Sequence, residues 1–199
     1  MGEQSISVAI PEGYAALPLA DIVENGEHLY EFGPQTTAGT PSIVSALTAL
    51  TGTLVDNGTR YCGIGAHRLP DGDPLYSCLT VTVRDTVGGP RNPRLVLSDL
   101  VRSRSADGTL GLSALVETDT HPVLFTEKVG SAMPGQSEEN QAPAVYQLQA
   151  VVPSEDGNSL VAIEFATPDT ERGIACRKMI SDMARSVKFG PQVTSSLNL

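Results

Sequence analysis

The sequence lacks a basic excess, a long hydrophobic run and a dense set of cysteines. Its 199 residues hold 13 Lys and Arg against 23 Asp and Glu, a net charge of −10. Nucleic acid and anionic membrane surfaces repel such a chain, so we expect neither as a partner. The apolar runs are too short to cross a bilayer, and we therefore expect no membrane insertion.

The composition is that of a globular protein. Hydrophobic residues make up 40% of the chain, and glycine and proline are scattered without a period, which excludes collagen, coiled coil and wholesale disorder. A chain of this length can form a hydrophobic core large enough for a stable fold without disulfide bonds or bound metal ions. We predict a single domain over residues 1–190, followed by a C-terminal tail over residues 191–199.

Two missing patterns predict the compartment: a signal peptide at the N-terminus and a secreted arrangement of cysteines. Met1-Gly2-Glu3 leads directly into polar residues, without the basic and apolar regions of a signal peptide. The three cysteines form no CxxC pair and no secreted disulfide pattern. We expect a cytoplasmic protein, and the alternative is a processed form of an exported or envelope-associated protein.

Three segments are predicted to be amphipathic helices, and each follows a capping residue and a proline. A capping oxygen satisfies a free amide, and proline fits the first helical position. The apolar stripe of each helix requires a sheet face to cover. The predicted helices are 41–56 after Thr40-Pro41, 93–104 after Asn92-Pro93, and 170–188 after Thr167-Pro168.

Alternating apolar residues predict at least six strands between these helices. Turn residues at 70–74 and 155–158 join neighbouring strands as hairpins, which makes the sheet antiparallel. The predicted fold class is α+β, with a mostly antiparallel β-sheet covered by amphipathic helices. The strands are expected around residues 6–10, 62–66, 75–83, 110–116, 123–125, 146–152 and 161–165.

The order of these elements resembles a known superfamily. An N-terminal strand leads into Ile10-Pro11-Glu12-Gly13-Tyr14, and a closing helix ends at Ser186-Val187-Lys188-Phe189. The chain resembles, over residues 5–189, the PsbP-like superfamily, which includes Mog-type proteins and LpqN-type lipoproteins of actinobacteria. The resemblance implies an α/β/α sandwich and a non-enzymatic accessory or binding role in a bacterium. The lipoprotein signal and lipidated cysteine of the LpqN-type members are missing here.

Motifs for catalysis, metal binding and cofactor binding are missing as well. There is no GxSxG elbow, no HxxxH and no calcium loop, and Gly63-Ile64-Gly65 lacks the third glycine of a dinucleotide fingerprint. We therefore predict no catalytic residue, no cofactor and no metal. Gly63 and Gly65 leave a bare strip on one strand face, which either serves core packing or forms a groove for a ligand or partner.

The cysteines are predicted to be three free thiols. If the turn at Asp71-Gly72 has two residues, Cys62 faces Val81, and Cys78 points to the other side of the sheet. A disulfide between the two would then have to cross the sheet. A three-residue turn would instead place Cys62 and Cys78 on the same face of the sheet. Cys176 lies on the apolar stripe of the last helix and is expected to be buried.

The predicted function is that of a non-enzymatic accessory or adaptor protein that binds another protein. The candidate contact surface is the loop 130–143. An acidic cluster near His28 either is an ordinary solvated face, which we favour, or attracts a basic partner. The alternative is a small-molecule-binding protein or enzyme that uses a groove near Gly63, Gly65, His67 and Cys78, with Tyr61 and Arg84 around it. The acidic cluster consists of Asp21, Glu24, Glu27 and Glu31.

Overall fold

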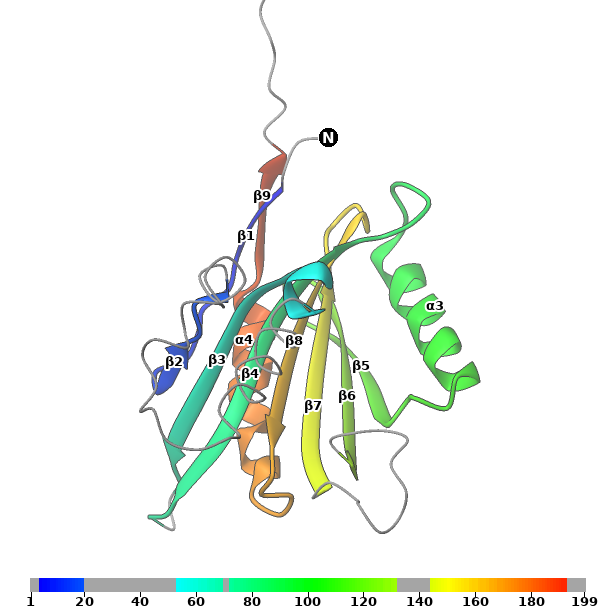
Figure 1. The fold of residues 1–199 in the computed structure, drawn as a ribbon. Helices are drawn as coiled ribbons and strands as arrows, with labels where there is room; N and C mark the ends of the chain where they lie inside the picture. Colours follow the sequence, from blue (N-terminus) through cyan, green and yellow to red (C-terminus); the bar gives the residue numbers. More distant parts are fainter. Residues whose placement is uncertain (1–3, 20–52, 70–71, 132–143, 193–199) are drawn as a thin grey trace, which may run out of the picture.

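The computed structural model describes residues 4–19, 53–69, 72–131 and 144–192. Its main feature is a seven-stranded sheet in which every pair of neighbours is antiparallel, in the order β2-β3-β4-β8-β7-β6-β5 (Figure 1). The strands are β2 (Tyr14–Ala16), β3 (Thr59–Arg68), β4 (Pro74–Asp85), β5 (Leu112–Glu117), β6 (Pro122–Ser131), β7 (Ala144–Pro153) and β8 (Ser159–Thr167).

The antiparallel α+β fold predicted from the sequence is confirmed, with differences at both ends of the chain. Strand β2 was not predicted, because its three residues are too few to show a period. A separate two-stranded sheet pairs β1 (Gln4–Ser7) with β9 (Lys188–Gln192). Gln4 lies opposite Gln192, the last residue of β9.

Helix α3 (Pro93–Ala106) begins where the sequence predicts it. The side chain of Asn92 accepts a hydrogen bond from the backbone N of Arg94 at 2.9 Å, and Pro93 occupies the first turn. Of the predicted helix 41–56, residues 53–56 are helical, and the rest lies outside the described residues.

The last helix begins later than the predicted residue 170. Thr167 and Asp169 form a turn instead, because the Thr167 hydroxyl accepts a hydrogen bond from the backbone N of Asp169 at 3.2 Å. A 3₁₀ helix, η3 (Gly173–Cys176), then leads into α4 (Arg177–Ser186). A Cβ at Gly173 would lie 2.5 Å from the Tyr146 ring, so this close approach requires glycine.

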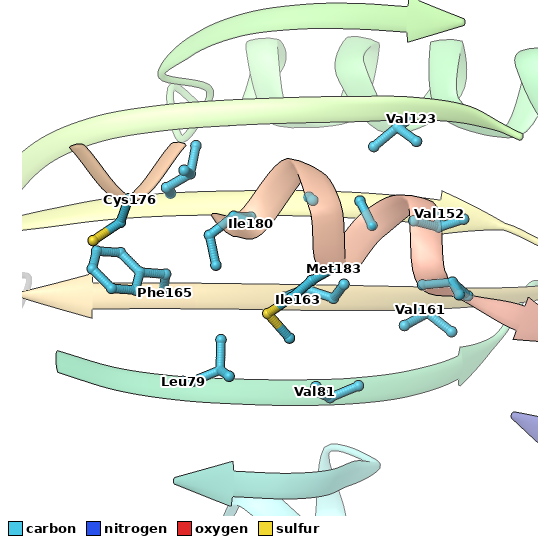
Figure 2. Close-up of a cluster of buried hydrophobic side chains, with 14 of the residues drawn as sticks. Leu79, Val81, Val123, Val152, Val161, Ile163, Phe165, Cys176, Ile180 and Met183 are labelled. Carbon is cyan, nitrogen blue, oxygen red and sulfur yellow. The ribbon is translucent and has the colours of Figure 1, made fainter. Parts of the chain in front are cut away.

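The main core lies between α4 and one face of the sheet, which we call the α4 face (Figure 2). Ile180 and Met183 from α4 pack over Leu79, Ile163 and Phe165 from the central strands, and all five side chains are buried. The other side of the sheet, the α3 face, carries a smaller core in which Leu97 of α3 meets strands β6 and β7.

The predicted covering of the sheet by amphipathic helices is seen only in part. In the described ranges α4 contacts β7 and β8, and α3 contacts β6 and β7. Ile64 and Tyr76, on the α3 face of β3 and β4, remain exposed. None of the helices in the described ranges has the length and apolar character needed to cross a membrane.

Candidate functional site

The bare strip predicted at Gly63 and Gly65 is filled by rings of the protein itself. A Cβ at Gly63 would lie 2.4 Å from the Tyr61 hydroxyl, and one at Gly65 would lie 2.6 Å from Nε2 of His67. The Tyr14 ring stacks 4.7 Å from His67, and its hydroxyl shares a 3.0 Å hydrogen bond with Ser77. Of the two interpretations, the structure supports core packing.

The described residues do not bring Gly63, Gly65, His67 and Cys78 together in one groove, because these four residues lie on two faces of the sheet. Gly63 pairs with Leu79 and therefore shares the α4 face, whereas Cys78 pairs with Ile64 on the α3 face. Arg84 is also turned away, since its guanidinium donates to the side chain of Asn57 at 3.1 Å. Burial lowers the pKa of His67, which favours a neutral imidazole.

The two-residue turn assumed for the cysteines was wrong, because strands β3 and β4 pair one residue away from that register, and the alternative arrangement is the one observed. Cys62 lies opposite Thr80 rather than Val81, so Cys62 and Cys78 are diagonal neighbours on the same face. All three cysteines are unpaired in the structure. Diagonal Cα atoms are about 7–8 Å apart in antiparallel pairs, which exceeds the usual reach of a disulfide.

Cys78 is the exposed member of this thiol pair, and Cys62 is buried. A hydrogen bond from Cys62 to the Cys78 thiolate lowers the pKa of Cys78 to about 7, although burial and Glu164 act in the opposite direction. The same bond and burial raise the pKa of Cys62. Cys78 is therefore the candidate reactive thiol of the protein.

We expect Cys78 to be alkylated first by iodoacetamide, with a rate that is half-maximal near pH 7, because the thiolate is the nucleophile. The rate falls below this pH, where the thiol is protonated. Cys62→Ala removes the hydrogen-bond donor and moves the midpoint up toward the usual thiol pKa of about 8.5. Mass spectrometry of the native protein measures the site and rate.

Cys176→Ala is the matched control and is expected to leave the alkylation midpoint unchanged, since Cys176 is a buried thiol outside the pair. The denatured, unreduced protein should show three reactive thiols. A Cys78 midpoint that stays in the usual thiol range in the parent protein contradicts the coupling of Cys62 and Cys78.

Strand β5 is the best candidate contact surface on the described chain. It was predicted as a strand, but its position at the edge of the sheet was not. All six of its residues are exposed, and its one neighbour in the described sheet is β6. The register with β6 is regular, and Leu112 is 79% exposed. A regular strand with an open edge can pair with a further strand.

An apolar groove of about 410 Å³ adjoins this edge on the α4 face. Leu112, Ala114 and Val116 form one wall, and Phe125 and Leu148 continue the apolar surface. Arg177 at the start of α4 borders the groove and donates to both oxygens of Glu127, at 2.9 Å from Nε and 2.7 Å from Nη2. This bidentate pair holds a charged group at the rim of the apolar surface.

The other predicted contact surfaces fall almost wholly outside the described residues. The acidic cluster Asp21, Glu24, Glu27 and Glu31 with His28 lies there, as does the loop 130–143 beyond its first two residues. Within the ranges that are described, no three His, Cys, Asp or Glu side chains gather in a way that would hold a metal ion.

The sequence matches no protein-family model and none of the curated proteins. Among solved structures, the chain is similar to LpqN, a protein involved in cell envelope biogenesis of Mycobacterium tuberculosis. The TM-score is 0.44 at 10% sequence identity, over 96% of this chain and 86% of that one. The resemblance to LpqN-type proteins thus has a distant structural counterpart, from which nothing follows about activity, partner or compartment.

Proposed function

We propose that this protein is a non-enzymatic accessory protein that binds an extended segment of another protein along strand β5. The observation that carries the proposal is the open edge of β5 beside an apolar groove. The unpaired backbone groups of an edge strand offer hydrogen bonds to any extended chain, whatever its sequence.

Strand β5 lacks the features with which proteins protect an edge from pairing. It contains no proline and no bulge, and Glu117 at its last position is its only charged residue. Arg94 on α3 donates to both oxygens of Glu117 at 2.8 and 2.9 Å, so even this charge is engaged within the protein. The strand is therefore chemically suited to accept a partner strand.

The groove supplies side-chain selectivity. Alternate residues of an added strand point to the same face, so every second side chain of the partner would enter the groove beside Leu112, Ala114 and Val116. These positions favour apolar side chains. The net charge of −10 favours basic residues that flank the bound segment, because long-range attraction raises the association rate.

The proposal is tested by selecting binders from a library of displayed linear peptides. We expect the selected peptides to have apolar residues at alternating positions and to protect the β5 amides from hydrogen exchange. The double variant Leu112→Asp/Ala114→Asp places charge in the groove and should weaken binding at least about tenfold, equal to about 1.4 kcal/mol. Both residues are exposed, so the fold should persist.

The matched control is Ile64→Asp/Val87→Asp, which adds the same charge at two exposed apolar residues outside β5 and should leave affinity unchanged, since Ile64 lies on β3 near the other end of the sheet. Peptides that bind the Leu112→Asp/Ala114→Asp variant as tightly as the parent contradict the proposal. Concentration-dependent dimerisation through β5, measured by analytical ultracentrifugation, would also contradict it, since the occupant would then be a second copy of the chain.

A further inference from the structure

A straight row of polar side chains crosses six strands on the α3 face. The pairings of the sheet place these residues directly opposite one another from strand to strand. In the adjacent row, Leu124, Val151 and Ala162 are apolar and pack under α3. The polar row consists of Ser113, Thr126, Gln149, Glu164, Thr80 and Cys62.

Hydrogen bonds fix the middle of this row. Glu164 accepts from the Gln149 amide at one oxygen and from the Thr80 hydroxyl, at 3.4 Å, at the other. The amide of Gln149 is thereby oriented with its carbonyl oxygen free to accept from Nη1 of Arg104, which reaches down from the last turn of α3. Glu164 thus positions Arg104 through Gln149 without touching it.

Arg104 and Lys128 are cations of the α3 face, and the Glu164 carboxylate, which lines the same hollow, attracts Arg104 without forming an ion pair with it. Neither cation forms an ion pair within the described chain, although the protein as a whole is strongly acidic. Burial lowers the pKa of Arg104, which reflects the partial loss of water around its guanidinium. Lys128 lies two residues from Thr126 on the same strand, and both line one hollow with Arg104.

Thr126 adds an independent indication of a ligand. The residue is only 7% exposed, and its hydroxyl has no hydrogen-bond partner in the structure. It is the direct neighbour of Gln149 in the row, and it lines the hollow, which has a volume of about 380 Å³. A buried hydroxyl without a partner is unfavourable, so a ligand that pairs with it gains affinity.

We propose that this hollow binds the anionic group of a small ligand, a carboxylate or a phosphate, between Arg104, Lys128 and the hydroxyl of Thr126. The guanidinium supplies parallel N–H donors, the ammonium supplies charge, and the hydroxyl supplies one directed hydrogen bond. The site lies on the α3 face, so it is independent of the groove beside β5.

The test titrates the full chain separately with inorganic phosphate and with acetate, at constant ionic strength maintained with chloride. We expect one saturable site with a Kd of about 1 mM for at least one anion. Binding of phosphate alone, of acetate alone, or of both supports the proposal and identifies the anion that the site accepts. Arg104→Gln should weaken binding at least about tenfold, because it removes the charged donors.

Arg102→Gln is the matched control, since Arg102 lies on the same helix, has 80% of its side chain exposed and contacts Asp99 on the surface. It should leave the affinity unchanged. Thr126→Val preserves shape and removes only the hydroxyl, so it should weaken binding about fivefold. Its melting temperature without anion should equal or exceed that of the parent, which shows that the variant is folded.

Two results would overturn the proposal. One is the absence of saturable binding of either anion in the millimolar range. The other is binding that Arg104→Gln and Thr126→Val leave unchanged, because the anion would then lie elsewhere on the protein. A raised melting temperature of the parent with anion, together with no such rise in the Thr126→Val variant, would place the anion at the hydroxyl.

Discussion

Replacing Phe165 with alanine is expected to lower the free energy of unfolding by about 3–5 kcal/mol. Phe165 is 1% exposed and lies on the α4 face of the central strand β8, beside Cys176 of η3 (Figure 2). It pairs with Leu79 on β4 and with Leu148 on β7. The Phe165 and Tyr146 rings form a T-shaped pair with their centroids 6.4 Å apart. Removal of the ring leaves a cavity that strands paired on both sides cannot close.

Urea denaturation followed by circular dichroism measures this loss. Ile174→Ala is the control, because Ile174 is an exposed apolar residue of η3 and its removal should change stability by less than about 1 kcal/mol. A loss below about 1 kcal/mol for Phe165→Ala would show that the core between α4 and the sheet is not packed as described.

Leu97→Ala is expected to cost about 2–5 kcal/mol and to loosen α3 in particular. Leu97 is fully buried against Leu124 and Val151, and Val96 is the only other residue of α3 that is buried. A helix held by so few side chains opens locally before the rest of the domain. Hydrogen exchange should therefore accelerate in α3 more than in α4.

The control for this helix is Leu95→Ala, which shortens an exposed leucine on the same turn and should leave exchange unchanged. Equal acceleration in α3 and α4 after Leu97→Ala would mean that the two helices open together, contrary to the small separate core under α3. Because Arg104 lies at the C-terminal end of α3, the same variant should also weaken anion binding.

The two proposed sites use opposite faces of one strand, β6. Phe125 lines the groove beside β5 on the α4 face, whereas Thr126, the next residue, lines the hollow on the α3 face. Neighbouring residues of a strand point to opposite sides of the sheet. The two sites therefore lie on the same strand but are lined by different side chains of it. The variants of one site thus serve as folding controls for the other.

The sequence by itself determined the elements that depend on local chemistry. Alternating residues predicted all of the central strands, and the Asn92-Pro93 pair located the start of α3. The same kind of cap at Thr167-Pro168 did not begin a helix, because the turn formed by Thr167 and Asp169 competes with it and Gly173 must approach the Tyr146 ring. Local signals predict where an element starts only when tertiary contacts agree with them.

Only the tertiary structure decided the register between strands and the position of each strand in the sheet. A shift of one residue between β3 and β4 brought Cys62 and Cys78 to the same face, since side chains alternate with a period of two. The edge position of β5 and the polar row from Ser113 to Cys62 likewise depend on the pairing of β4 with β8, two strands distant in sequence. Periodicity along one strand shows which residues share a face, but only pairing across strands determines what each of them meets.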